Sequence, residues 1–172
     1  MANEEQTSKD TQELIDRAWS IAQKTRNATL VTVEGTKPIA RPMSAHVDEL
    51  THTISFLTAA DSRKTRNDGD QVVVFFINGN SYVSVTGGLS VSNDRARIRE
   101  LWTPFVKAWW DSPEDPDIRV LDVAPSEIEI WDGPNKLFAG ALMLTAAVTG
   151  AKPKVGDHAK ASAVNPTHNT AE

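Results

Sequence analysis

Three neighbouring polar residues could bind an anion. Ser62, Arg63 and Lys64 follow the predicted strand His52–Thr58 and open a predicted helical turn. Backbone N–H groups at a helix N-terminus favour an anion, and adjacent cations strengthen the preference through charge-assisted hydrogen bonds. Together with Arg41–Ser44 on the preceding strand, this loop could form a pocket for a flat, phosphorylated ligand. The alternative is a two-strand meander that ends in an ordinary solvated loop, with Arg63 projecting into solvent.

Pro42 gives the preceding strand, Pro38–Val47, a special position in the predicted sheet. Proline lacks the N–H that a central ladder needs, so this strand is predicted to lie at an edge or to bulge. A hairpin over Gly35-Thr36-Lys37 joins it to the strand before it. Backbone groups at such an edge are free to bond a ligand instead of another strand.

The remaining elements follow from the period of the apolar residues. Period-two patterns and turn residues predict further strands over Ala28–Glu34, Gln71–Ile77, Ser81–Val91, Ile118–Ala124 and Ile128–Trp131. Helical spacing predicts helices over Thr11–Thr25, Asp94–Leu101 (capped by Ser92 or Asn93) and Phe138–Val148. About seven short strands separated mostly by turns predict a mostly β fold, an antiparallel barrel with flanking helices rather than a βαβ sheet.

Two details of this pattern concern the centre of the sheet. Gln71–Ile77 is apolar on both faces, which predicts a central strand, and Asn78-Gly79-Asn80 after it is a strong hairpin turn. Gly87-Gly88 predicts a bulge or a tight corner, because it lacks the spacing of either nucleotide fingerprint.

Length and charge narrow the class of protein. The 172 residues suit one domain over 11–150, with a flexible N-terminus over 1–10 and a flexible tail over 151–172. A net charge of −5 argues against a nucleic-acid-binding protein. No apolar run approaches the roughly 18 residues of a membrane span. The chain has no cysteine, which excludes disulfides and thiolate chemistry and fits the cytoplasm.

The chain offers few catalytic groups of its own. The four histidines have no metal-ligand spacing, no serine lies in a Gly-x-Ser-x-Gly elbow, and no carboxylate pair suggests acid/base chemistry. The acidic segment Asp111–Asp117 could hold a cation, but it lacks the pattern of a calcium loop and fits a solvated loop better. If the protein performs chemistry, a cofactor should carry it.

Tryptophan is over-represented, with five tryptophans against one tyrosine. Trp102, Trp109 and Trp110 crowd one predicted helical region. They are either core residues or a flat wall, at a subunit interface or against a ring, and the crowding favours an interface.

In this context the chain resembles the general stress protein branch of the pyridoxamine 5'-phosphate oxidase-like flavoproteins. The resemblance spans about Asp10 to Gly150 and rests on motifs that fall in the family's order. These are Arg41-Pro42-Met43, Ile54–Thr58, Ser62-Arg63-Lys64, Tyr82–Gly87, Leu101–Pro104, Lys107-Ala108-Trp109, Asp115-Pro116-Asp117 and Glu129–Asp132.

The resemblance implies an FMN-binding split barrel of antiparallel Greek-key type, and a homodimer with the flavin at the subunit boundary. It implies that the flavin is lined by Arg41, Pro42, Met43 and Ser44. It implies that the ribityl phosphate is held by Thr58, Ser62, Arg63 and Lys64. It implies that the ring is covered by Trp109 or Trp110 of the partner. The sequence departs from the family pattern here, since Trp110-Asp111-Ser112 stands where a phenylalanine and a proline-glycine turn are expected.

The resemblance thus implies a flavoprotein and leaves three functions open. The first is an FMN-dependent oxidoreductase whose substrate the sequence does not reveal. The second is a non-catalytic flavin-binding module of a stress response. The third keeps the barrel and replaces FMN with a deazaflavin or with haem, for which His46 is the candidate axial ligand.

Overall fold

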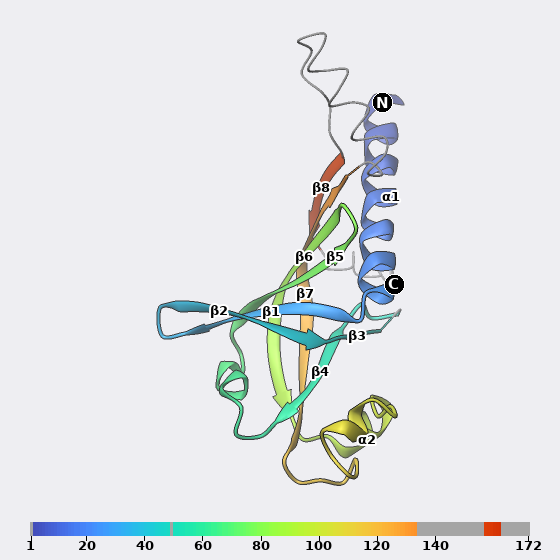
Figure 1. Cartoon of the computed structure of the whole chain (residues 1–172). Coiled ribbons are helices and arrows are strands. Elements are labelled where there is room, and N and C mark those ends of the chain that lie inside the picture. The colour runs from blue at the N-terminus through green and yellow to red at the C-terminus, as the bar shows by residue number, and fades with distance from the viewer. Residues whose placement is uncertain (1, 49, 134–156, 163–172) are drawn as a thin grey trace, which may run out of the picture.

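The sheet dominates the structure. The computed structural model describes residues 2–48, 50–133 and 157–162. In these ranges eight strands form one antiparallel sheet in the order β2-β1-β5-β6-β7-β4-β3, with β8 paired to β7 (Figure 1). The strands are β1 Asn27–Glu34, β2 Lys37–Ser44, β3 His46–Val47, β4 Ile54–Ala59, β5 Gln71–Asn78, β6 Ser81–Ser92, β7 Ile118–Asp132 and β8 Asp157–Ser162. The sheet curls into a half-barrel with two helices, so the predicted fold class is confirmed.

Helix α1, Ala2–Lys24, covers the inner face of this sheet. Its buried residues Ala18, Trp19 and Ala22 belong to the main core together with alternate residues of the strands, such as Val83 and Ile130. Figure 1 shows α1 running alongside the β6–β8 end of the sheet. The helix begins earlier than the predicted Thr11, because the first ten residues contain neither glycine nor proline to stop it.

Pro42 lies in an edge strand, as predicted. β2 ends the strand order and pairs only with β1 among the described strands. The β1–β2 register runs without a shift from Glu34↔Lys37 to Asn27↔Ser44, so the edge alternative holds and the bulge alternative does not. The predicted strand Pro38–Val47 is divided at Ala45, whose N–H donates to the carbonyl of Arg26 instead of to a strand.

The longest strand, β7, joins two strands that the sequence predicts separately. β6 pairs with β7 from Val120 to Asp132 on one edge. On the other edge, β4 pairs with the first part of β7 and β8 with the last part. The β6–β7 register shifts between Thr86 and Gly87, which confirms the predicted bulge. A Cβ on Gly87 would lie 2.4 Å from the carbonyl oxygen of Ala124, so only glycine fits there.

Three short helices complete the described part of the chain. α2, Arg95–Glu100, is capped by Asp94, whose side chain accepts from the N–H groups of Ala96 and Arg97. The predicted caps Ser92 and Asn93 lie two residues and one residue too early, respectively. η1, Arg63–Asn67, and η2, Val106–Ala108, are 3-10 helices. None of the described helices is long and apolar enough to cross a membrane.

The predicted C-terminal tail contains regular structure. β8 lies within 151–172, and its pairing runs from Asp132↔Asp157 to Glu127↔Ser162. Its sequence, Asp-His-Ala-Lys-Ala-Ser, has none of the β-branched or aromatic residues that indicate a strand. The expectation of a flexible tail therefore does not fit these six residues. The predicted helix Phe138–Val148 lies outside the described residues.

Candidate functional site

Most of the predicted flavin-site residues lie around one pocket. This pocket, here the Lys64 pocket, has a volume of about 530 Å³. The predicted residues that line it are Pro42, Met43, Ser44, Thr58, Lys64, Trp109 and Trp110. The other lining residues are Asn27, His46, Leu57, Ala59, Phe105 and Val106. The volume falls within the range that small-molecule and cofactor sites occupy.

Three elements bring these residues together. Edge strand β2 supplies Pro42–Ser44, and the end of β4 supplies Leu57 and the buried Thr58. The segment around η2 supplies the aromatic wall. A second core cluster anchors the chain before and after this segment, with Ile98 and Leu101 packed against Ile118 and Val120 of β7.

The tryptophans take two different roles. Trp102 and Trp110 are partly buried against the second core cluster, as the core alternative required. Trp109 is 74% exposed and lines the open side of the Lys64 pocket with Phe105, which is 67% exposed. The resemblance assigned the covering tryptophan to the partner. In the structure Trp109 and Trp110 line the pocket of their own chain, together with Leu57 and Thr58 of β4, and the covering of the ring by a partner's tryptophan stays a prediction.

Lys64 is the cationic residue in the lining of this pocket. Burial lowers the pKa of its ammonium group, and the charge of Arg41 lowers it further. Both effects mean that the folded protein holds this positive charge at a cost. A lysine in this state at the end of an apolar pocket is a candidate binding group for a phosphate.

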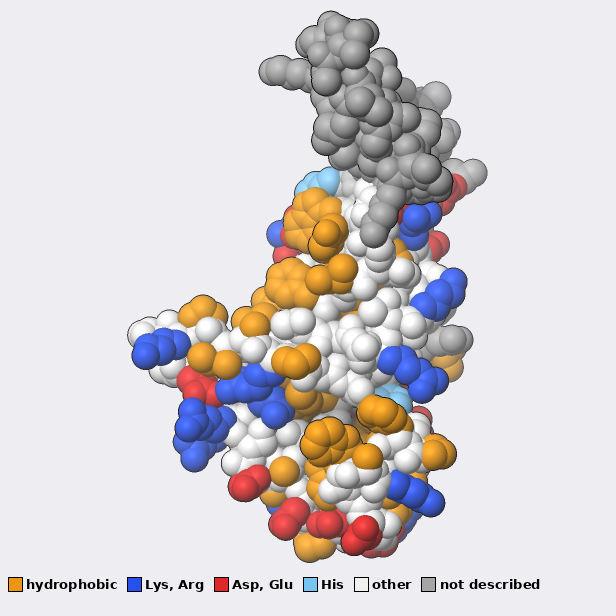
Figure 2. Space-filling model, in the orientation of Figure 1, with side chains coloured by type: hydrophobic (Ala, Val, Ile, Leu, Met, Phe, Trp, Pro, Cys, Tyr) orange, Lys and Arg blue, Asp and Glu red, His pale blue; other side chains and the backbone are white. Residues whose placement is uncertain are grey.

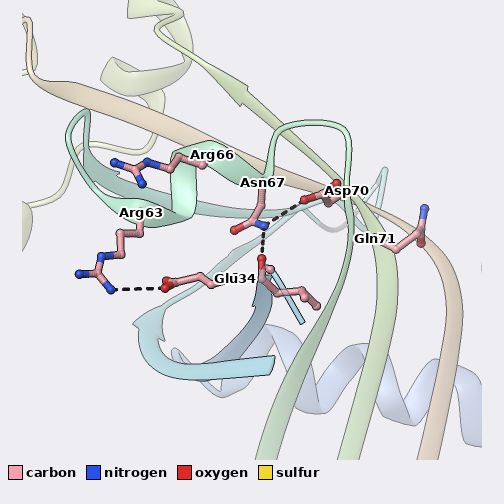
Figure 3. Close-up of a pocket in the computed structure, with 8 residues that line it drawn as sticks. Glu34, Arg63, Arg66, Asn67, Asp70 and Gln71 are labelled. Carbon is pink, nitrogen blue, oxygen red and sulfur yellow. Dashed lines mark hydrogen bonds and ion pairs between the residues drawn. The ribbon is translucent and has the colours of Figure 1, made fainter. Parts of the chain in front are cut away.

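Three of the predicted residues do not line the Lys64 pocket. Arg41 donates to Thr32 Oγ1 at 2.8 Å and forms an ion pair with Glu34, which directs its guanidinium toward β1. Hydrogen bonding from Arg41 lowers the pKa of Glu34. Ser62 precedes η1, where its N–H donates to the carbonyl of Ala59. Arg63 forms an ion pair with Glu34 at 3.4 Å and lines a separate pocket (Figure 3).

The helical turn after Ser62 differs from the predicted helix N-terminus. The predicted helical turn after Ser62 exists, but η1 is a 3-10 helix of five residues, and Ser62 makes no side-chain capping hydrogen bond. So short a helix sums few peptide dipoles. Any anion at this site would therefore depend on the side-chain cations rather than on the helix.

His46 is a lining residue that the sequence analysis considered only as an axial haem ligand. It forms β3 with Val47 and pairs with Ser55 of β4. Burial lowers the pKa of its imidazole, and the charges of Arg26 and Arg97 add to the effect. The ring is therefore neutral at pH 7 and can accept or donate one hydrogen bond in the pocket.

Asn27, Phe105 and Val106 also line the pocket and were not predicted. No sequence pattern identifies them, because Asn27 begins β1 and Phe105 and Val106 begin η2, and the tertiary fold sets the direction of both segments. Among the described residues there is no group of three or more histidine, aspartate and glutamate side chains that could hold a metal ion. The Lys64 pocket is thus suited to a flat aromatic ligand with an anionic end.

Comparison with known proteins identifies the family that the sequence resembles. The family model for pyridoxamine 5'-phosphate oxidase-like proteins matches residues 13–154. General stress protein 26 of Bacillus subtilis (strain 168) is 23% identical over 132 residues, which cover 73% of this chain and 93% of that protein.

Two solved structures share the fold. The general stress FMN/FAD binding protein of Xanthomonas citri is 27% identical, with a TM-score of 0.64 over 70% of this chain and 89% of that chain. General stress protein 26 of Bacillus anthracis str. Sterne is 24% identical, with a TM-score of 0.61 over 68% of this chain and 92% of that chain. On the strength of the family match, this chain belongs to the pyridoxamine 5'-phosphate oxidase-like family.

Proposed function

We propose that this protein binds FMN in the Lys64 pocket and is a flavin-dependent oxidoreductase. The observation that carries the proposal is the half-buried ammonium of Lys64, which has a lowered pKa and lies in a pocket with an apolar and aromatic wall. FMN has a phosphate for the first feature and a flat ring for the second. The similarity to a protein named for FMN/FAD binding supports the choice of a flavin.

The residues of the pocket would divide the binding between them. Lys64 would pair with the phosphate, and the polar groups of Ser44 and Thr58 would bond the ribityl chain. Phe105 and Trp109 would contact the ring and exclude water from it. The edge of β2 that is not paired with β1 would offer backbone groups to the polar edge of the ring. When bound, FMN would supply the electron transfer, and we assign no catalytic acid or base.

The active form in this proposal is a homodimer with the flavin near the subunit boundary. Ile77, Tyr82 and Trp131 are direct cross-strand neighbours on β5, β6 and β7, and they are 56%, 47% and 40% exposed. Directly paired residues share one face of a sheet. The core residues of these strands alternate with them, so this face is opposite the one that α1 covers.

The surface that these residues form, here the apolar row, is extended by two further side chains. His158 of β8 stacks on Trp131 with ring centroids 5.3 Å apart. Phe75, two residues before Ile77, is 37% exposed. Figure 2 shows hydrophobic side chains gathered over this part of the sheet. A contiguous apolar patch of this kind commonly marks a protein interface, and a second copy of the chain would cover it. The cytoplasmic location stays a prediction from the absence of cysteine.

An absorbance spectrum of the purified protein tests the cofactor directly. We expect the two visible bands of an oxidised flavin, either as isolated or after incubation with FMN and removal of the excess. A protein that stays colourless after this treatment would contradict the proposal. A Soret band would instead favour haem, with His46 as the imidazole that lines the pocket. A single absorbance band at the wavelength of a deazaflavin would favour a deazaflavin.

A second measurement separates the oxidoreductase from a non-catalytic flavin-binding module. The holoprotein is mixed with NADH or NADPH without oxygen, and bleaching of the flavin is followed with time. Reduction, followed by reoxidation with an electron acceptor, is expected for the oxidoreductase. A flavin that binds but is reduced no faster than free FMN would indicate the binding module.

A further inference from the structure

A second pocket adjoins η1 and shares no lining residue with the Lys64 pocket. This pocket, here the Arg66 pocket, has a volume of about 750 Å³, which lies within the range of small-molecule sites (Figure 3). It is lined by Val33, Glu34, Gly35, Arg63, Arg66, Asn67, Asp70 and Gln71. The proposed function assigns no role to these residues, so a ligand in this pocket would be independent of the flavin.

The lining of the Arg66 pocket carries charges of both signs. Arg63 and Arg66 stand at i and i+3 of a 3-10 helix, where side chains eclipse each other. Figure 3 shows both side chains extending to the same side of η1. Two carboxylates, those of Glu34 and Asp70, line the same pocket. The two arginines and two acidic residues sum to no net charge, which disfavours a ligand that carries only negative charge.

The guanidinium groups are only partly neutralised. Arg63 lies 3.4 Å from Oε2 of Glu34, whose other oxygen, Oε1, is held by Arg41. Arg66 forms no ion pair with any residue that the structure describes. Arg66 and Arg63 could therefore bind a ligand carboxylate together, since guanidinium donors match carboxylate oxygens well. A positively charged group of the same ligand could then take the place of Arg63 at Glu34 Oε2.

Asn67 provides an independent sign of a ligand that donates a hydrogen bond. The residue is only 5% exposed, and its Nδ2 donates to the carbonyl of Val33 at 2.7 Å and to Asp70 at 2.9 Å. These two bonds fix the amide plane and leave the buried Oδ1 without a hydrogen-bond partner. In Figure 3 this oxygen points away from Asp70, toward the side of the pocket where Arg63 and Glu34 lie. A buried acceptor without a donor is unfavourable, and a ligand N–H group would satisfy it.

We infer that the Arg66 pocket binds a zwitterionic α-amino acid, which carries a carboxylate and an ammonium group on one carbon atom. The carboxylate would bind to Arg66 and Arg63. The ammonium group would donate to Asn67 Oδ1 and to Glu34 Oε2, which lie on the same side of the pocket. An inorganic phosphate would match the guanidinium groups, but the carboxylates of Glu34 and Asp70 would repel it.

The size of the pocket favours an amino acid with a large side chain. A volume of about 750 Å³ is more than a carboxylate and an ammonium group fill. Val33, which is 46% exposed, adds apolar surface to the lining. The guanidinium planes of Arg63 and Arg66 can stack on an aromatic ring. An aromatic amino acid such as phenylalanine therefore suits the pocket.

Isothermal titration calorimetry of the full-length protein with L-phenylalanine tests this site. N-acetyl-L-phenylalanine lacks the ammonium group and L-phenylalanine amide lacks the carboxylate, while both keep the side chain. We expect L-phenylalanine to bind about tenfold or more tightly than either analogue, because each analogue loses one set of charge-assisted hydrogen bonds. Inorganic phosphate should bind more weakly than L-phenylalanine.

Two variants test the partners of the two charged groups. Arg66→Ala removes a partner of the carboxylate, and Glu34→Gln removes a partner of the ammonium group without changing the length of the side chain. Each should weaken L-phenylalanine about tenfold. Arg66→Lys should restore part of the loss, because it keeps the charge without the planar guanidinium group.

Arg99→Ala serves as the matched control. Arg99 is an exposed arginine of α2 that pairs with Glu114, and its loss changes the net charge as Arg66→Ala does. It should leave the affinity unchanged, and the thermal midpoint of each variant verifies folding. No binding of L-phenylalanine, equal binding of one analogue, tighter binding of phosphate, or an unchanged affinity in Arg66→Ala would each overturn the inference. None of these outcomes bears on the proposed flavin site, which lies in the other pocket.

Discussion

Arg63 and Lys64 are adjacent in the chain but line different pockets. Both residues lie in the 3-10 helix η1. Its three-residue period places Arg63 on the same face as Arg66, and it directs Lys64 toward β4 and the aromatic wall. Arg63 is exposed and has a carboxylate partner, whereas Lys64 is half-buried, and no ion pair involves it in the described part of the chain. An anion in the Lys64 pocket would therefore be bound mainly by Lys64.

Replacement of Lys64 should affect stability and binding in opposite directions. Burial and the charge of Arg41 lower the pKa of Lys64, so its positive charge destabilises the ligand-free fold. Lys64→Met removes that charge and keeps the length of the chain, so the melting temperature of the apoprotein should rise. FMN should bind about ten- to hundredfold more weakly, because one charge-assisted hydrogen bond of about 1.5–3 kcal/mol is lost.

Differential scanning calorimetry and fluorescence titration measure these two changes. Lys24→Met, at the exposed end of α1, is the control for loss of one positive charge. It should not weaken FMN. If Lys64→Met retains the affinity of the unmodified protein, the phosphate does not lie at Lys64.

His46 should make the stability of the protein depend on pH. Its pKa is lowered in the folded state, mainly by burial, so below the ordinary value of about 6.5 the unfolded chain binds more protons than the folded one. Stability should therefore fall as the pH drops through that value toward the folded pKa. His46→Gln should flatten this dependence between pH 7 and pH 5.5 in thermal melts.

The comparison for this experiment is His158→Gln, which replaces an exposed histidine of β8. For each variant, the melting temperature is plotted against pH, and the slope is compared with that of the unmodified protein. This comparison is needed because other groups also titrate in this range. A His46→Gln slope that matches the unmodified protein would show that His46 titrates as it does in the unfolded chain.

The sequence predicted much of this fold because local patterns agree with the tertiary contacts. Pro42 indicated an edge strand, and β2 is an edge strand. Gly79 takes a φ of 63° in the predicted hairpin turn, where glycine has no steric penalty. β5 is central, as predicted, but the described residues of the chain leave Phe75 and Ile77 on one of its faces exposed. An apolar side chain looks the same in the sequence whether a core or a partner will cover it.

The sequence could not assign the pocket residues with the same success. Whether Arg63 or Lys64 faces the aromatic wall depends on the phase of η1, and an α-helical turn would have given a different phase. Asn27 and Phe105 reach the pocket only because β2 and the η2 segment meet there. β8 takes its conformation from the free edge of β7 rather than from its own residues.

The bulge between β6 and β7 should be sensitive to a single methyl group. A Cβ on Gly87 would lie 2.4 Å from the Ala124 carbonyl oxygen, and backbone atoms cannot move aside cheaply. Gly87→Ala should destabilise the protein by about 2–3 kcal/mol, by the same physics as overpacking a core. Gly88→Ala is a close control, since the nearest atom would be 3.7 Å away, on the side chain of Gln71. Urea denaturation measures both; equal midpoints for the two variants would mean that the strands separate at the bulge without strain.

The apolar row offers a test of the proposed dimer. Ile77 is 56% exposed and lies next to Tyr82 in the β5–β6 register. In a two-fold interface each substitution occurs twice, and burial of an unpaired carboxylate is strongly unfavourable. Ile77→Asp should therefore weaken dimerisation by about a hundredfold or more, roughly 3 kcal/mol or above. Light scattering at micromolar concentration should show a dimer for the unmodified protein and a monomer for the variant.

Leu50→Asp is the control for a new charge on an exposed apolar residue outside the row, since Leu50 is 90% exposed in the loop before β4. It should leave the dimer intact. If the flavin lies at the subunit boundary, Ile77→Asp should also weaken FMN, because the open side of the Lys64 pocket, where Phe105 and Trp109 are exposed, would lose its cover. A monomeric variant that binds FMN with unchanged affinity would place the flavin within one subunit, while an unmodified protein that is itself monomeric would remove the apolar row as an interface between copies.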